Sequence, residues 1–150
     1  MPETLKSRLQ SDMKSSMKSG DKGRLGVIRL MLSAIKQVEV DERIELDDDR
    51  IIAVLDKMSK QRRESISQFD GAGRDDLSKI EQAELEIIQE YMPAALSEQE
   101  IIELVEQSIA STGAASIKDM GKVMGLLKPK LQGRADMGKV SQLIKSRLSA

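Results

Sequence analysis

Residues 91–105 read YMPAALSEQEIIELV, and this stretch decides how the chain is organised. Pro93 lacks a backbone N–H, so it ends the helical pattern that precedes it. Ser97 and Glu100 then form a capping-box pattern, in which both side chains satisfy free N–H groups at the start of a helix. A hydrophobic stripe follows at once. We therefore predict a boundary here, between one domain over residues 1–95 and a second over residues 96–150.

Upstream of the boundary, hydrophobic residues recur every three or four positions, which places them on one face of a helix. The first of four expected helices runs from about Thr4 to Ser19, and the hydrophobic faces of the other three span residues 25–38, 51–69 and 77–91. A polar link, residues 41–48, separates the second from the third. Asp48 or Asp49 is expected to cap the third helix and Asp75 or Asp76 the fourth, because a carboxylate can accept hydrogen bonds from unpaired N–H groups. The buried face of the fourth helix is expected to carry Leu77, Ile80, Ala83, Ile87 and Tyr91.

Downstream, the same spacing predicts three shorter helices. The first carries the stripe Ile101, Ile102, Leu104, Val105 and Ile109 and ends at Gly113. Ser116 is expected to cap the second, and Pro129 and Gly133 are expected to bound a loop. The inward-facing residues of this second helix are expected to be Ile117, Met120, Val123, Met124 and Leu127. Asp136 is expected to cap the third, which carries Val140, Leu143, Ile144 and Leu148. No segment alternates with period two. The sequence thus predicts an all-α fold: an N-terminal four-helix domain followed by a small three-helix C-terminal domain.

The composition removes several kinds of chemistry. The chain has no Cys and no His, so zinc sites and imidazole-dependent nucleophiles have no ligands or base. No apolar run approaches the roughly 18 residues typical of a membrane span. We expect no catalytic residue, no metal, no cofactor and no membrane contact, and therefore a binding protein more than an enzyme. The absence of Cys fits a reducing compartment, and we expect the cytoplasm.

The first helix looks a little like a transit peptide or a membrane-surface helix. Leu5, Leu9, Met13 and Met17 recur every four residues among lysines and serines. Acidic residues nearby argue against a transit peptide. We expect this helix to pack on its own domain.

Charge is distributed unevenly along the chain, although the net charge is only −1. The balance is +4 over residues 1–40, −11 over residues 41–112 and +6 over residues 113–150. Such a basic segment is typical of a surface that contacts nucleic-acid phosphates, and the alternative is a solvated helical face. The residues expected to bind RNA are Lys118, Lys122, Lys128, Lys130, Arg134 and Lys139. Gly121 and Gly125 interrupt a predicted helix among them, which suggests close approach to the backbone by a helix or by RNA.

A second basic group lies in the third helix. Lys60 and Arg63 are three residues apart and can share a face, and Arg62 adjoins them. We consider it a possible second basic site. The alternative is a network of ion pairs within the helix, with Asp56 and Glu64.

Several motifs in this order are those of the YqeY family, which the sequence resembles over nearly its whole length. They are Lys60–Ser65, Gly73-Arg74 with Asp76-Leu77, Tyr91-Met92-Pro93, Leu96-Ser97-Glu98, Lys118–Met124, Pro129-Lys130 and Gly133–Asp136. That family is similar to the tail of the GatB subunit of tRNA-dependent amidotransferases and to an appendage of some glutaminyl-tRNA synthetases. The resemblance implies two helical domains, help in holding tRNA, and a carbon–nitrogen ligase activity with glutamine as amido-N donor.

Two functions follow as expectations. The first is an accessory protein that binds tRNA or another structured RNA and is linked to tRNA-dependent amidotransfer or aminoacylation. The second is a helical adaptor that docks on an aminoacyl-tRNA synthetase or an amidotransferase, with its acidic helices facing a basic partner.

Overall fold

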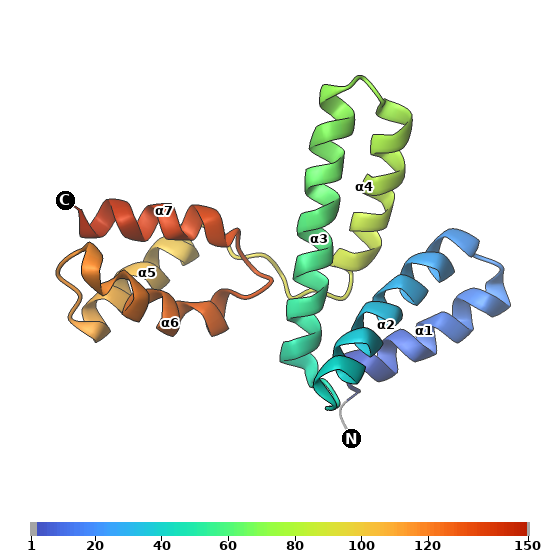
Figure 1. Ribbon diagram of the computed structural model, residues 1–150, viewed down its shortest axis with the longest axis horizontal. Helices are drawn as coiled ribbons and strands as arrows, with labels where there is room; N and C mark the ends of the chain where they lie inside the picture. Colours follow the sequence, from blue (N-terminus) through green and yellow to red (C-terminus); the bar gives the residue numbers. More distant parts are fainter. Residues whose placement is uncertain (1–2, 150) are drawn as a thin grey trace. The chain divides into compact units, whose positions relative to one another are not determined.

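The computed structural model describes residues 3–149 and confirms the all-α prediction: these residues form seven α-helices and no strand (Figure 1). The helices are α1 (Leu5–Ser19), α2 (Lys22–Glu42), α3 (Asp48–Gly71), α4 (Asp75–Gln89), α5 (Glu98–Thr112), α6 (Met120–Leu131) and α7 (Met137–Leu148), with a short 3₁₀ helix, η1 (Ile117–Asp119), before α6. Contacts divide the chain into an N-terminal unit, Met1–Met92, and a C-terminal unit, Pro93–Ala150. That each unit is an independent domain remains a prediction.

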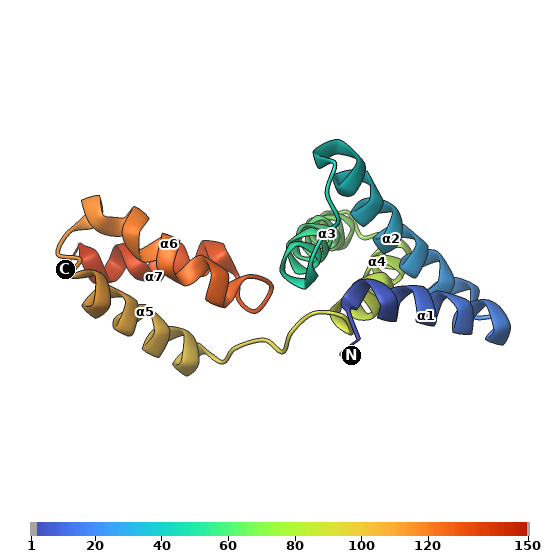
Figure 2. The ribbon, with the colours of Figure 1, turned by 90° about the horizontal axis from the view of Figure 1, so that it is seen from below.

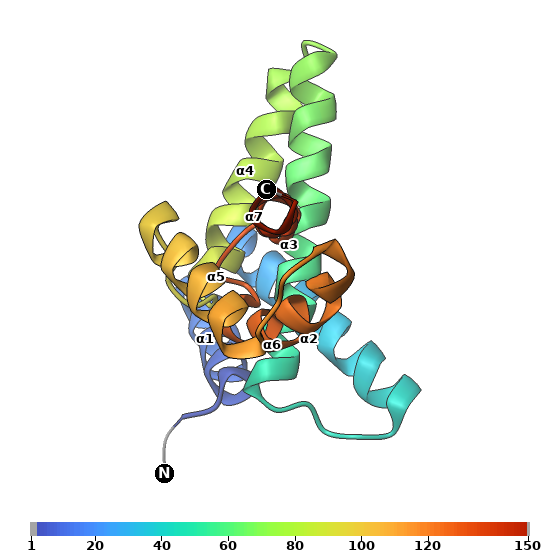
Figure 3. The same cartoon turned by 90° about the vertical axis from the view of Figure 1, so that its left-hand side faces the viewer.

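The N-terminal unit consists of two helical hairpins, α1–α2 and α3–α4. In Figure 1 and Figure 3, α3 and α4 lie side by side over most of their length. The core between the hairpins is almost entirely aliphatic, because each helix contributes the residues of its three-and-four spacing. It comprises Leu9, Val27, Ile28, Met31, Ile35, Leu46, Ile51, Leu55, Met58, Ile88 and Tyr91. Leu9 is fully buried there, so the first helix packs on its own unit as expected.

Glu39 holds together the corner between α2 and α3. Its carboxylate accepts a hydrogen bond from the backbone N–H of Leu46 at 2.9 Å and is 3.0 Å from the Lys6 ammonium of α1. Arg43 ends α2 in the left-handed conformation, with φ of 58°. The Leu46 N–H, and then Lys6, lower the pKa of Glu39 below its ordinary value. One carboxylate therefore joins α1, α2 and the turn into α3.

The Glu39→Gln variant is expected to be less stable than wild type at neutral pH and less sensitive to acid. Because the folded pKa is the lower one, the carboxylate stabilises the fold above the unfolded value near 4.5. That stabilisation is lost as the pH falls through the folded pKa. Urea midpoints followed by circular dichroism from neutral pH downward should therefore converge for the two proteins in acid. The exposed Glu86→Gln variant is the control, and parallel curves for Glu39→Gln would contradict the assignment.

Tyr91 connects the C-terminal end of α4 to α1. Its side chain is buried, its hydroxyl donates a hydrogen bond to the Asp12 carboxylate, and the Arg8 guanidinium lies 4.6 Å from the ring centroid. Burial, and then Asp12, raise the pKa of Tyr91 well above its usual range, so the phenol stays protonated. Glu90 adds a 2.8 Å ion pair to Arg24 of α2. The residues just before Pro93 are thus fixed within the N-terminal unit.

Two expected caps in this unit are wrong. Asp47, not Asp48 or Asp49, caps α3, because the preceding turn leaves its side chain beside the N–H of Arg50. Asp75 and Asp76 lie inside the first turn of α4, and the N-cap residue is Arg74. Their carboxylates still complement the positive end of the helix dipole.

The expected buried face of α4 is also partly wrong. Ile80 is 57% exposed and Ala83 is exposed, whereas Ser78 and Ile88 are buried. The reason is that α4 packs mainly against α3. A single neighbouring helix covers a narrower strip of the α4 surface than several neighbouring helices would. Helix α2 also ends later than the expected end at Val38, at Glu42.

The C-terminal unit contains the three expected helices, and α5 and α7 run in the same general direction while α6 runs back (Figure 1, Figure 2). Its core is small: Val105, Val123, Leu127, Leu131, Val140, Ile144 and Leu148. The capping box of Ser97 and Glu100 is confirmed, with both hydrogen bonds at 3.2 Å. Asp136 also caps α7 as expected, accepting from the N–H of Gly138 at 2.9 Å.

The expected loop from Pro129 to Gly133 is wrong at its start. Pro129 lies inside α6, which continues to Leu131. A proline there costs a backbone hydrogen bond, but continuing the helix brings Leu131 into the core, where it is fully buried. Ile117, expected inside, is 45% exposed on η1. The close approach expected at Gly121 and Gly125 is absent within the described residues: a methyl group added at either would meet nothing within 4 Å.

Candidate nucleic-acid interface

The basic residues of the C-terminal unit lie on η1, on α6, on α7 and in the loop before α7. Lys118, Lys122, Lys128, Lys130 and Lys139 are all exposed. None of these five ammonium groups makes a salt bridge within residues 3–149. Five lysine charges are therefore available to an anionic partner.

The lysines of α6 are spread around the helix. Lys122 and Lys130 are eight residues apart and lie on the same side, whereas Lys128, two residues from Lys130, lies on the opposite flank. Between these flanks, the solvent face carries Gly121, Gly125 and Pro129, which have little or no side chain to hold a ligand away. Helix α6 thus presents a smooth surface with positive charge on both sides, and not a single row of lysines.

Arg134 has a structural contact that sequence reasoning missed. Its Nε donates a hydrogen bond to the carbonyl of Ala94 at 3.1 Å, and its own carbonyl accepts one from the N–H of Leu96 at 2.9 Å. The residues just before α5 are thereby tied to the loop between α6 and α7. The side chain is only half-buried, so Arg134 is a weaker candidate for RNA contact than the five lysines.

Asp119 shapes the approach to α6. Its carboxylate accepts hydrogen bonds from the N–H groups of Ala115 and Ser116, at 3.0 and 3.4 Å. The bond from Ala115, and less strongly the bond from Ser116 and the charge of Lys122, lower the pKa of Asp119. Asp119 therefore remains ionised at neutral pH and orders the turn that presents Lys118 and Lys122.

The second basic group is divided by the structure. Arg62 is largely buried and pairs with Glu84 of α4 at 3.1 Å, so it joins α3 to α4. Lys60 and Arg63 are exposed on α3. The expected alternative, an ion-pair network within α3, is wrong for Arg62, because its carboxylate partner comes from the neighbouring helix. Only Lys60 and Arg63 remain as candidates for ligand contact.

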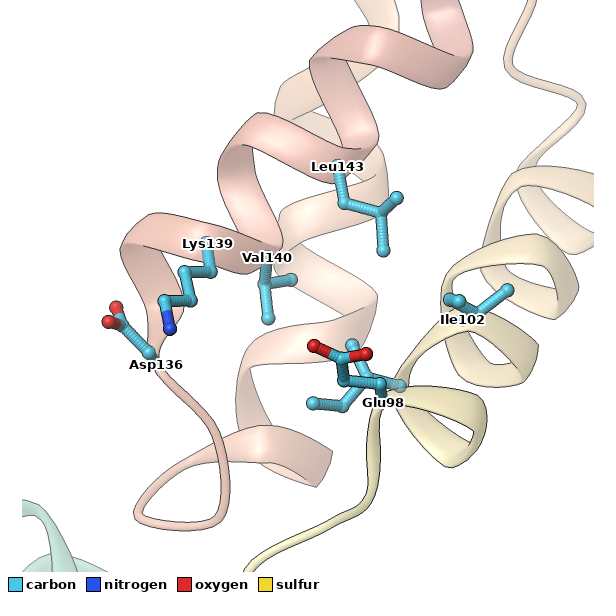
Figure 4. A pocket seen from close by; sticks show the side chains of 7 residues that line it. Glu98, Ile102, Asp136, Lys139, Val140 and Leu143 are labelled. Atoms are coloured by element: carbon cyan, nitrogen blue, oxygen red, sulfur yellow. The ribbon is translucent and has the colours of Figure 1, made fainter.

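Helix α5 has the opposite charge from α6 and α7. It carries Glu98, Glu100, Glu103 and Glu106 and no basic residue. A pocket of about 320 Å³ lies between α5 and α7 (Figure 4). It is lined by Glu98, Ile101, Ile102, Asp136, Lys139, Val140 and Leu143. The C-terminal unit therefore has a basic region on η1, α6 and α7 and a separate acidic helix beside an apolar pocket.

Metal and membrane sites are not found in the described part of the chain. No group of three or more Asp, Glu, His or Cys side chains within it could hold a metal ion. No helix among residues 3–149 is long and apolar enough to cross a membrane.

Comparison with known proteins identifies the family. The model of the Yqey-like protein family matches residues 6–148, nearly the whole chain. The chain therefore belongs to the Yqey-like family, as the motifs from Lys60 to Asp136 indicated.

Its curated relatives include proteins named altered inheritance of mitochondria protein 41, mitochondrial. The relative from Pyrenophora tritici-repentis is 32% identical over 130 residues, which cover 85% of this chain and 71% of the relative. Those from Eremothecium gossypii and Saccharomyces cerevisiae (strain YJM789) are 41% and 38% identical over 87 residues, which cover 57% of this chain and 48% and 47% of the relatives. The chain thus spans 71% of the length of the first of these relatives and about half the length of the other two. Their names place those proteins in mitochondria, and a cytoplasmic location for this chain remains a prediction.

Proposed function

We propose that the C-terminal unit binds tRNA or another structured RNA through the phosphate backbone. The observation that carries the proposal is a set of five exposed lysines that form no salt bridge within residues 3–149: Lys118, Lys122, Lys128, Lys130 and Lys139. Lysine ammonium groups bind phosphate oxygens as point charges and release counterions from the nucleic acid. The resemblance of the family to the tRNA-holding tail of GatB supports the same ligand.

Recognition by shape and charge is proposed over recognition of unpaired bases. Sequence-specific binding of single strands uses aromatic side chains on which bases stack. The only aromatic residues of the chain, Phe69 and Tyr91, belong to the N-terminal unit, and Tyr91 is buried. A backbone contact by lysines needs no such platform, which favours a folded RNA with closely spaced phosphates.

The role proposed for the whole protein is that of an accessory factor in tRNA-dependent amidotransfer or aminoacylation. The C-terminal unit would hold the RNA while a separate enzyme, an aminoacyl-tRNA synthetase or an amidotransferase, carries out the chemistry. An alternative is an adaptor that contacts such an enzyme directly, and the acidic helix α5 is the observation that favours it.

The test is binding of the purified full chain to total tRNA across a series of salt concentrations. Contact of the five lysines with phosphates should make log affinity fall linearly with log salt, with a slope of about −4. A homopolymeric single strand should bind more weakly at each salt concentration. Absence of tRNA binding at low salt would overturn the proposal, as would equal affinity for the unstructured strand.

A further inference from the structure

Helices α5 and α7 pack together along a seam that is closed by a salt bridge at one end and open at the other. At one end, Arg147 of α7 and Glu106 of α5 form a 2.8 Å salt bridge across the seam. At the other, the pocket opens among Glu98, Asp136 and Lys139 (Figure 4). Glu98 and Lys139 are eight residues before Glu106 and Arg147 respectively, so they occupy equivalent places two turns earlier. Within the described residues they form no salt bridge, and the seam stays open there.

The floor of this pocket is apolar. Ile101 and Ile102 come from α5, and Val140 and Leu143 come from α7. Figure 4 shows Ile102 and Leu143 approaching the pocket from the two different helices. Along α5 the lining of the pocket runs from Glu98 to Ile102, about 6 Å given the rise of a helix. That length accommodates about one turn of a second helix and its apolar side chains.

The charged side chains around the apolar floor of the pocket indicate which kind of partner would bind there. Helix α5 carries four glutamates and no basic residue, and Glu98 is exposed at the rim of the pocket. Asp136 adds a further exposed carboxylate at the rim, against the single ammonium of Lys139. Arg147 is already paired with Glu106. A ligand seated on the floor would therefore meet a surplus of negative charge, most of it along α5.

We infer that this groove, formed by Glu98, Ile102, Leu143 and their neighbours, docks a short amphipathic helix of a partner protein whose apolar stripe is flanked by Lys or Arg. Apolar side chains three and four residues apart would fill the pocket, and the basic flank would face α5. The inference does not rest on RNA binding, because the acidic surface of α5 would repel phosphates. Lys139 alone belongs to both surfaces.

The experiment uses the ¹⁵N-labelled full chain and a synthetic helical peptide of about 18 residues with leucines three and four apart and lysines on both flanks. Amide shifts are expected at Ile102, Val140 and Leu143 on addition of this peptide. A second peptide with glutamates in place of the lysines should shift these amides far less. Equal shifts with the two peptides would overturn the inference, as would shifts confined to α4, whose surface is also acidic.

Variants of the full chain test the charge and the floor separately. Glu98→Lys should weaken binding of the lysine peptide severalfold, because an exposed attractive pair becomes repulsive. Leu143→Ala should weaken it by removing part of the floor while leaving every charge in place. Glu86→Lys on α4, where the side chain is also exposed, is the matched charge control and should bind normally. Equal loss in the control would mean general attraction to an acidic protein and would overturn the docking site.

Discussion

Replacing Leu127 with alanine is expected to unfold the C-terminal unit while the N-terminal unit keeps its structure. Leu127 is fully buried at the centre of a core of only seven residues. Truncation of a buried leucine to alanine typically costs about 2–5 kcal/mol, because the removed methyl groups leave a cavity. A single core in a unit this small supplies about 3–5 kcal/mol in total. The loss is therefore comparable with the whole stability of the unit.

Two-dimensional NMR of the full chain measures this result directly. Amide signals of residues 97–148 should collapse toward random-coil positions, while those of α1 to α4 stay dispersed. The control is Leu126→Ala in the preceding position of α6, where the side chain is 37% exposed. Loss of both sets of signals would show that the two units fold together. An unchanged spectrum would contradict the assignment of the core.

Neutralising four lysines around η1 and α6 is expected to remove most tRNA binding. In the variant Lys118→Gln, Lys122→Gln, Lys128→Gln and Lys130→Gln, each lost phosphate contact should lower the magnitude of the salt slope by about 1. The affinity at low salt should fall by about a hundredfold to a thousandfold, since each contact also loses its counterion release. Exposed glutamines at these positions leave the core residues Val123, Leu127 and Leu131 untouched.

The matched control removes the same charge from another part of the chain. Lys14, Lys18, Lys22 and Lys36 are exposed on α1 and α2 of the N-terminal unit. Changing these four to glutamine should leave the salt slope within about one of the wild-type value. If the control loses as much affinity as the variant on η1 and α6, binding depends on net charge, and the proposed interface is wrong.

The two proposals depend on different residues of the C-terminal unit. The RNA surface needs the lysines of η1 and α6, whereas the groove needs the apolar floor and the glutamates of α5. The lysine variant should therefore still dock the basic peptide. Leu143→Ala should likewise keep the tRNA salt slope of the wild type, because it removes no charge. Failure of one proposal thus leaves the other open to its own measurement.

The sequence by itself determined the helical class and the number of helices. These depend on local chemistry, because a helix satisfies its own backbone hydrogen bonds and signals its ends through nearby residues. Ser97 with Glu100 and Asp136 were read correctly because a cap acts over three residues or fewer. Family motifs across the chain identified the Yqey-like family for the same reason: they are properties of residue order.

Only the tertiary structure decided which charged side chains have partners and which helix faces are buried. Arg62 donates a hydrogen bond to Glu84, Lys6 to Glu39, and Arg134 to the carbonyl of Ala94. In each case more than 20 residues of the chain separate the two partners. The exposure of Ile80 and the pocket between α5 and α7 likewise depend on how neighbouring helices pack. Helical periodicity can place a residue on a face of its own helix, but it contains no information about which other helix covers that face. Packing settled Arg62 and Arg134 as structural contacts and left the five lysines exposed.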